Sequence, residues 1–119
     1  MILLDTNALI WLLQGHRRAN ALRSRARLQM SPASLLELQL LIESGRLTLR
    51  TATTLAAVAD DPRWRFDEPP AGKWFAQAVE IGWTRDPFDR MIVAHAMVAG
   101  AALVSKDRLI RKHCDKAIW

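Results

Sequence analysis

The sequence predicts one α/β domain over residues 1–119, with a central, mostly parallel sheet of about five short strands between two layers of helices. Short apolar runs typical of strands alternate with longer segments in which apolar residues recur at helical spacing. The strand-like runs are apolar throughout, which is expected when helices cover both faces of a sheet. A chain of 119 residues is long enough for one core and too short for two domains.

The first half of the chain begins with a strand-like run that ends in an acid, Asp5. The elements expected there are, in order, a strand over 2–4, a helix that ends at Gly15, a basic helix over 19–28, a strand over 28–30, and helices over 34–44 and 51–59.

The second half opens with the only long loop-like stretch, residues 60–72, which contains three of the five prolines. This stretch predicts two turns around a short strand at 64–66. The elements expected after it are helices over 73–81 and 88–99, a strand over 102–104, a short helix over 107–112 and a last strand over 117–119.

Composition limits the compartment and the partners. The chain carries 17 basic and 12 acidic side chains, and five arginines without any acid lie within residues 16–27. Either an anionic partner or a solvated helix face explains that segment. The N-terminus lacks the basic region of a secretory signal, no apolar stretch is long enough for a membrane span, and the single Cys114 excludes an internal disulfide. We therefore expect a cytoplasmic protein.

Acidic residues stand where apolar segments meet turns or helix starts. They are Asp5, Glu37, the pair Asp86 and Asp89, and Asp107. Because parallel strands end at the same edge of a sheet, Asp5 and Asp107 are expected side by side. Clustered carboxylates without cysteines favour Mg²⁺ or Mn²⁺ over zinc, and such a site activates water for phosphodiester hydrolysis.

Each acid also has a purely structural explanation. Ser34 and Glu37 fit a capping box, Asp86 fits the N-cap of the helix after it, and Asp107 fits the N-cap of the short helix that follows. Asp5 is the hardest to explain in this way, since a carboxylate at the end of an apolar strand is costly without a partner.

Four segments in order carry a family resemblance: LLDTNALIWLL at 3–13, SPASLLELQLLIESGRL at 31–47, RDPFDRMIVAHAMVAG at 85–100 and LVSKDRLIR at 103–111. The chain resembles the PIN-domain ribonucleases, and more closely the VapC-type toxins of toxin–antitoxin pairs. The resemblance implies a PIN-like three-layer α/β/α fold.

The resemblance also implies a set of site residues. The catalytic acids match Asp5, Glu37, Asp89 and Asp107, and the supporting polar residues match Thr6, Asn7 and Ser105. Asp5 and Asp89 are expected to hold Mg²⁺, for which Mn²⁺ can substitute, with Asp107 at a second site. Asp86 competes with Asp89 for the third acidic position, because it lies only three residues earlier.

The function implied is that of a Mg²⁺-dependent endoribonuclease toxin, a homodimer silenced by a cognate antitoxin protein. The arginines expected to grip RNA phosphates are Arg23, Arg27, Arg85 and Arg90. A PIN nuclease of RNA processing without an antitoxin and a catalytically silent binding scaffold remain alternatives. A phosphatase with two acids after its first strand is disfavoured, because Asn7 takes the place of the second acid.

His95 lies on the apolar face of the predicted helix over 88–99, at helical spacing from Phe88 and Met91. We expect it to be a packed or interface histidine rather than a metal ligand.

Overall fold

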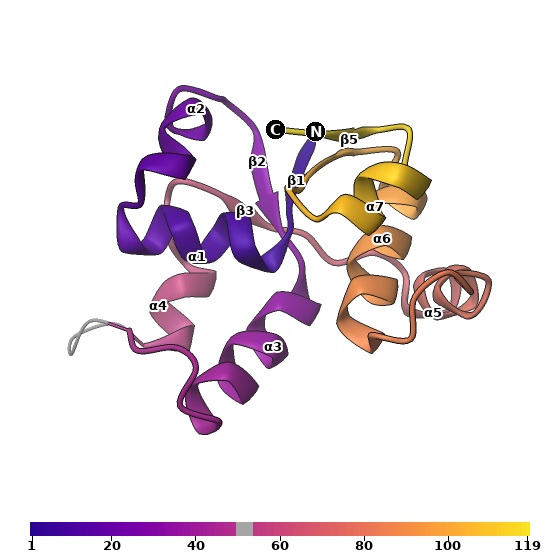
Figure 1. Cartoon of the computed structure of the whole chain (residues 1–119), viewed down its shortest axis with the longest axis horizontal. Coiled ribbons are helices and arrows are strands. Elements are labelled where there is room, and N and C mark those ends of the chain that lie inside the picture. The colour runs from indigo at the N-terminus through magenta and orange to yellow at the C-terminus, as the bar shows by residue number, and fades with distance from the viewer. Residues whose placement is uncertain (50–53) are drawn as a thin grey trace.

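The computed structural model describes residues 1–49 and 54–119, and at its centre lies a five-stranded sheet in the order β3-β2-β1-β4-β5 (Figure 1). The strands are β1 (Ile2–Leu4), β2 (Leu28–Met30), β3 (Arg65–Phe66), β4 (Ala102–Val104) and β5 (Ala117–Ile118). Every pair of neighbouring strands is parallel, so the expectation of a mostly parallel sheet of about five strands is confirmed.

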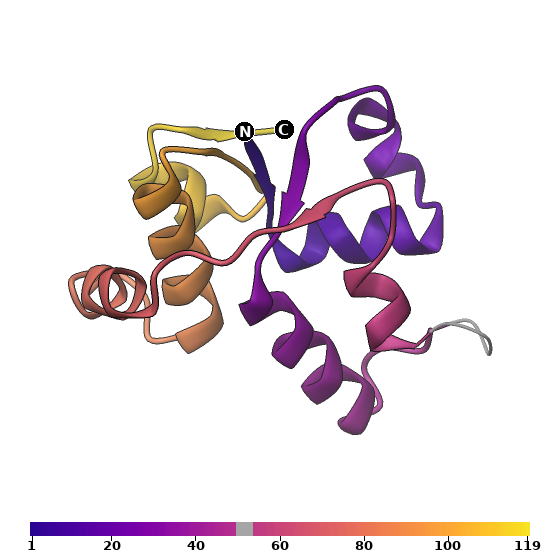
Figure 2. The same cartoon turned by 180° about the vertical axis from the view of Figure 1, so that it is seen from behind.

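The helices cover both faces of this sheet (Figures 1 and 2). They are α1 (Thr6–Gln14), α2 (Asn20–Arg23), α3 (Pro32–Glu43), α4 (Leu55–Ala59), α5 (Ala71–Val79), α6 (Pro87–Ala99) and α7 (Arg108–His113).

The central strand β1 shows why the strands are apolar on both faces. Successive side chains of a strand point to opposite faces of the sheet. Leu4 packs in a core cluster with Leu9 of α1 and Leu38 of α3, whereas Leu3 packs in a second cluster with Ile92 of α6. Both leucines are fully buried, so this strand contributes to two cores with two adjacent residues.

The predicted basic helix over 19–28 is wrong. A short 3₁₀ helix (Arg17–Ala19) leads into α2, which ends at Arg23. The chain must reach the sheet early, because Ile2 is paired with Leu28 and the Ile2 N–H donates to the Arg27 carbonyl at 3.3 Å. Arg27 takes up the change of direction with a left-handed backbone angle, φ 63°.

The other expected elements are present with small shifts of their ends. The helix expected over 51–59 is found as α4 at Leu55–Ala59, and residues 51–53 lie outside the described residues. The helix expected over 73–81 begins two residues earlier, at Ala71, directly after the two prolines. In the described ranges no helix has both the length and the hydropathy to cross a membrane.

Gly100 ends α6 in the left-handed conformation, φ 63°, and its N–H donates to the Met97 carbonyl at 3.3 Å. A side chain at this position would be strained even though no atom lies near its Cβ. We expect Gly100→Ala to lower the free energy of unfolding by about 1 kcal/mol in urea denaturation. An unchanged urea midpoint would show that α6 ends without this constraint.

Candidate metal and phosphodiester site

The carboxyl end of the sheet gathers the polar residues that follow the strands. Asp5 directly follows β1 and Ser105 directly follows β4, and the two strands are parallel neighbours. The Asp5 N–H donates to the Val104 carbonyl at 3.1 Å, which fixes the start of the turn. Asp5 is only 5% exposed and Ser105 is fully buried, so a carboxylate and a hydroxyl meet beneath the surface.

The Asp5 carboxylate has partners on both sides. Its Oδ1 accepts from the Ala8 N–H at 2.7 Å, which makes Asp5 the N-cap of α1. Burial raises the pKa of Asp5, while hydrogen bonds from Ser105 and from the Ala8 N–H oppose the rise. The charge of Asp107 raises this pKa further. Asp5 therefore caps a helix and also stands among other acids.

Glu37 does not belong to a capping box. Helix α3 begins directly after Ser31, whose Oγ accepts from a backbone N–H of the first turn at 3.2 Å. Ser34 is thus inside the helix, and Glu37 lies a turn beyond the unpaired N–H groups. Ser34 is fully buried, with its Oγ 3.1 Å from Thr6 Oγ1. Burial raises the pKa of Glu37, and the Thr6 hydroxyl opposes this rise.

Asp86 and Asp107 do cap helices, as their structural explanations predict. The Oδ1 of Asp86 accepts from the backbone N–H groups of Phe88 and Asp89, at 2.8 and 3.1 Å. The Oδ1 of Asp107 accepts from two N–H groups of α7, at 2.9 and 3.0 Å. Within the described ranges the Oδ2 of each residue accepts no hydrogen bond, and both residues are exposed.

Asp89 lies one turn into α6 and is half-buried. Burial, followed by the charges of Asp86, Asp107, Glu37 and Asp5, raises its pKa to about 7. The charges of four other acids thus act on Asp89, although burial has the largest effect. Figure 1 shows α3 and α6, which carry Glu37 and Asp89, below the same end of the sheet.

The donor chemistry fits a hard divalent cation. Among the described residues, no three His, Cys, Asp or Glu side chains stand close enough together to enclose an ion. Mg²⁺ does not need such an enclosure, because it commonly binds one or two carboxylates and keeps several waters. The acids offer only oxygen donors, which suit a hard cation. A bound cation would also offset the burial and the like charges that raise the pKa of Asp89.

The four arginines expected near the acids are divided between two ends of the molecule. Arg85 and Arg90 flank the start of α6, where Arg90 Nε donates to the Thr84 carbonyl at 2.8 Å. Arg27 precedes β2, and Arg23 lies at the end of α2, whereas Asp5 follows the parallel strand β1. Arg23 and Arg27 therefore lie at the opposite end of the sheet from the acids. Asn7 is exposed in the first turn of α1.

His95 is a packed residue, as expected. It is fully buried, its Nε2 lies 2.6 Å from Asp67 Oδ2, and its ring meets Trp74 edge to face at 5.3 Å. Burial lowers the pKa of His95, although Asp67 opposes this shift. No local pattern pointed to Asp67 as the partner of His95, because 28 residues separate the two.

An all-parallel five-stranded sheet with helices on both faces and acids at its carboxyl end places this chain among the three-layer α/β proteins. The family model for the PIN domain matches residues 2–116, and the chain belongs to that family. No curated protein matches the sequence significantly.

Several solved structures share the fold over their whole length. A chain of a toxin–antitoxin complex from Klebsiella pneumoniae has a TM-score of 0.74 at 18% identity, with 100% of this chain and 97% of that chain covered. VapBC2 from Rickettsia felis, bound to a promoter DNA fragment, has a TM-score of 0.64 at 20% identity, with 99% of this chain and 96% of that chain covered. FitAcB from Neisseria gonorrhoeae has a TM-score of 0.63 at 24% identity, with 100% of this chain and 96% of that chain covered.

The raised pKa of Asp89 predicts how stability depends on pH. An acid with a pKa of about 7 in the folded state and an ordinary value of 3.8 stabilises the fold below about pH 4. This contribution is lost as the pH rises to about 7. Asp89→Asn stays uncharged, so at pH 8 without metal the variant should melt higher than the wild type by about 5 °C. This rise corresponds to about 1 kcal/mol in the free energy of unfolding. The value is small because solvent screens a half-exposed carboxylate.

The difference should shrink as the pH falls to 4, and differential scanning calorimetry measures it. Asp115→Asn is the matched control, since Asp115 is exposed and precedes β5 at the other end of the sheet. Equal melting temperatures of wild type and Asp89→Asn across this range would contradict the crowding of carboxylates.

Proposed function

We propose that this chain is a Mg²⁺-dependent endoribonuclease and the toxin of a type II toxin–antitoxin pair. The observation that carries the proposal is the placement of acids at the carboxyl end of the sheet, where Asp5 follows β1 and Asp107 comes after the parallel neighbour β4. Burial and the charges of the other acids raise the pKa of Asp89, which agrees with this placement. Membership of the PIN domain family, a family of nucleases, supports hydrolysis of a phosphodiester bond.

The acids have different roles in the proposed site. Asp5 and Asp89 hold Mg²⁺, for which Mn²⁺ substitutes, while Glu37 and Asp107 orient water or a second cation. Asp86 lies three residues before Asp89 and competes with it for this position. When bound, the cation supplies positive charge that activates water and stabilises the charge on the scissile phosphate.

The uncharged and basic residues support these acids. Ser105 and Thr6 each lower the pKa of a neighbouring acid, Asp5 and Glu37 respectively, and in the proposed site their hydroxyls orient these carboxylates. Asn7, exposed next to Thr6, is suited to contact a water or the substrate. Arg85 and Arg90 offer positive charge beside the acids and attract the RNA backbone, which an acidic site alone would repel.

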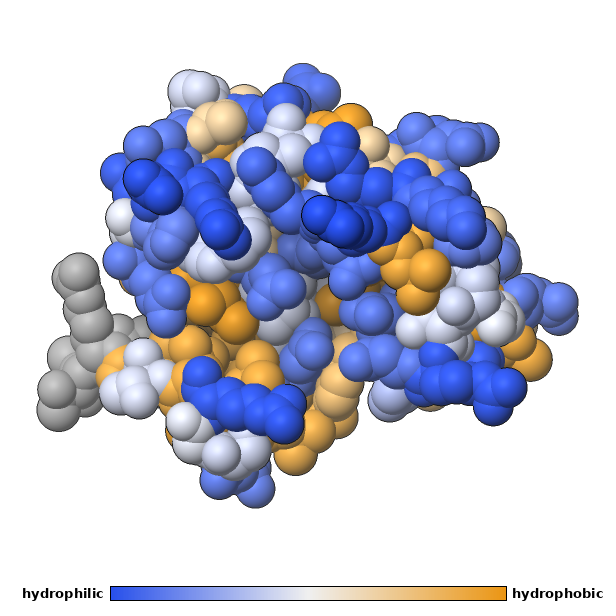
Figure 3. Space-filling view, viewed as in Figure 1, coloured by the Kyte–Doolittle hydropathy of each residue, from blue (hydrophilic) through white to orange (hydrophobic). Residues whose placement is uncertain are grey.

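The protein partners follow from the comparisons and from one surface. The structures from Klebsiella pneumoniae and Rickettsia felis, which share the fold, are a toxin–antitoxin complex and VapBC2. Leu36 and Leu40 of α3 are 57% and 45% exposed, and Figure 3 shows apolar side chains over this part of the molecule. We infer a cognate antitoxin as inhibitor, a homodimer that covers exposed apolar residues, and a cytoplasmic location.

Cleavage of total RNA by the purified protein tests the activity. We expect discrete products with Mg²⁺ or Mn²⁺ and none with EDTA. Asp5→Asn should reduce the rate by at least about 100-fold, since it removes a charged group of the site while the amide oxygen still caps α1. Products should end in 5′-phosphate and 3′-hydroxyl, because the proposed hydrolysis does not use the 2′-hydroxyl.

Asp115→Asn, prepared in the same way, is the control and should cleave like the wild type. Equal cleavage by Asp5→Asn and wild type would indicate a contaminating nuclease and remove the support for the site. A 2′,3′-cyclic phosphate product would contradict metal-dependent hydrolysis. A folded, metal-loaded protein that cleaves no RNA would favour the binding scaffold.

A further inference from the structure

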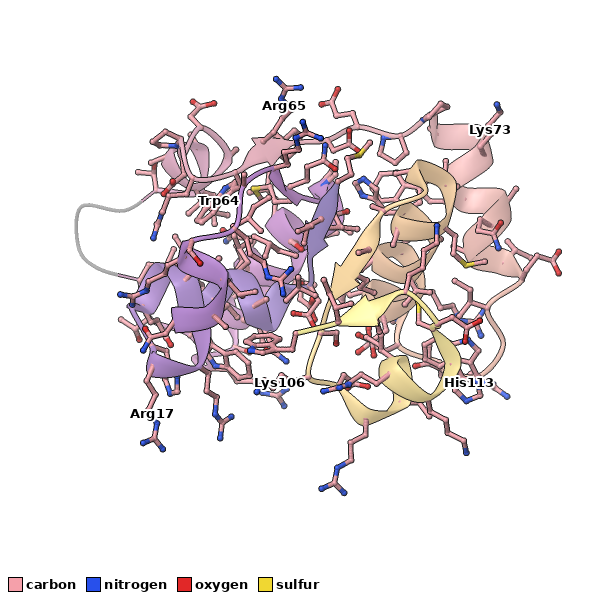
Figure 4. The ribbon with its side chains drawn as sticks, turned by 90° about the horizontal axis from the view of Figure 1, so that it is seen from above. Arg17, Trp64, Arg65, Lys73, Lys106 and His113 are labelled. Atoms are coloured by element: carbon pink, nitrogen blue, oxygen red, sulfur yellow. The ribbon has the colours of Figure 1, made fainter. Side chains whose placement is uncertain are left out.

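A hollow of about 640 Å³ lies at the other end of the sheet, where the strands begin. It is bordered by the amino ends of β1, β2 and β3 and by the turn between α4 and β3. Figure 4 looks onto this end of the molecule and labels Arg65 and Trp64 at the β3 side. The parallel strands run from this hollow to the acidic site, so the two sites are separate.

Gln29 is the unusual residue of this hollow. It stands in the middle of β2 between two buried apolar residues, and its own side chain is only 7% exposed. In the part of the chain that the structure describes, its Oε1 has no hydrogen-bond partner. A buried amide oxygen without a partner is unfavourable, and an apolar residue would serve the core better. An external partner for the amide would explain why this polar residue stands there.

Two arginines stand beside Gln29. Arg65 is its register partner on the parallel neighbour β3, so both side chains leave the same face of the sheet. Arg27 holds its left-handed backbone angle two residues before Gln29, a conformation that residues other than glycine rarely adopt. Both arginines are exposed, and neither forms an ion pair with a described residue.

Arg63, by contrast, is already engaged. Its guanidinium pairs with Asp61 at 2.8 Å, donates to the Leu12 carbonyl at 3.1 Å and lies over the Trp64 ring at 4.7 Å. The pair with Asp61 leaves no net charge, and the remaining Asp60 is outweighed by Arg27 and Arg65. The lining is therefore net positive.

We propose that this hollow binds a nucleoside phosphate. A guanidinium group binds phosphate oxygens in pairs, and two such groups remain available. Gln29 also lines the hollow, and its amide carries a donor and an acceptor side by side, the pattern that complements the edge of a base. Its Oε1 is shielded in the free protein, so binding requires a rotation of this side chain. The volume suits a ligand of nucleotide size, whereas inorganic phosphate would fill only a small part.

The inference rests on the proposed function for the origin of the ligand. A ribonuclease meets nucleoside phosphates as units of its RNA strand and as free nucleotides after degradation. The two sources share the same chemistry, and the size of the probe distinguishes them.

Isothermal titration calorimetry in EDTA tests the proposal without cleavage. The probes are the four nucleoside 5′-monophosphates, inorganic phosphate and a short single-stranded RNA. We expect at least one nucleotide-containing probe to bind the wild type more tightly than phosphate. Arg65→Gln and Arg27→Gly should each weaken its binding at least about 5-fold. Glycine suits the backbone angle of Arg27, so the second variant keeps the fold.

Arg111→Gln, on the exposed side of α7, removes the same charge elsewhere and should bind like the wild type. Gln29→Met should alter the preference among the four bases. Binding of a monophosphate identifies free nucleotides as the source, and binding of the RNA alone identifies the strand. Each of these outcomes supports the proposal.

Three outcomes would overturn it: no binding of any nucleotide or RNA, equal binding by the wild type and both arginine variants, or binding of inorganic phosphate as tight as that of every nucleotide-containing probe. The test is separate from that of the proposed function, which depends on Mg²⁺ and Asp5. If the protein cleaves RNA in an Asp5-dependent way but binds no nucleotide in EDTA, only the proposal for the hollow is wrong. If it binds nucleotides but does not cleave RNA in this way, only the proposed ribonuclease activity is wrong.

Discussion

The burial and mutual repulsion of carboxylates near the carboxyl end of the sheet is the constraint on which the proposed site depends. The parallel topology creates it, because β1 and β4 end side by side and place Asp5 next to the segment that carries Asp107. Helices α3 and α6 then add Glu37, Asp86 and Asp89. Burial of Asp5 makes the arrangement costlier still, since a buried carboxylate is poorly solvated. A cation and its waters would relieve both effects.

Helix capping provides part of the compensation inside the protein. Asp5, Asp86 and Asp107 each use Oδ1 to accept from backbone N–H groups of the helix that follows. The positive end of a helix stabilises such a charge, and the Oδ2 of the two exposed caps remains open to a ligand. Capping and metal binding are thus compatible roles of the same residue.

The local sequence predicted the strands and most helices, because those signals lie within a few residues, and the acids it singled out remain the proposed site. It failed where a distant contact decides. The basic helix over 19–28 is interrupted since β2 must align with β1. The role of Glu37 changes because Ser31, rather than Ser34, begins α3, and Thr6 from another helix reaches the carboxylate. Arg27 lies far from the acids because it precedes β2, whereas Asp5 follows the parallel strand β1. The contact between His95 and Asp67 joins segments 28 residues apart, so no local pattern could indicate it.

The melting temperature measured against Mg²⁺ and Mn²⁺ concentration tests the central claim most directly. If crowded carboxylates form one cation site, either ion at millimolar concentration should raise the melting temperature of the wild type by several degrees at pH 8. Asp5→Asn should lose most of this rise, while Asp115→Asn should keep it. A wild-type melting temperature that does not respond to either ion, or an equal rise in Asp5→Asn, would contradict the account.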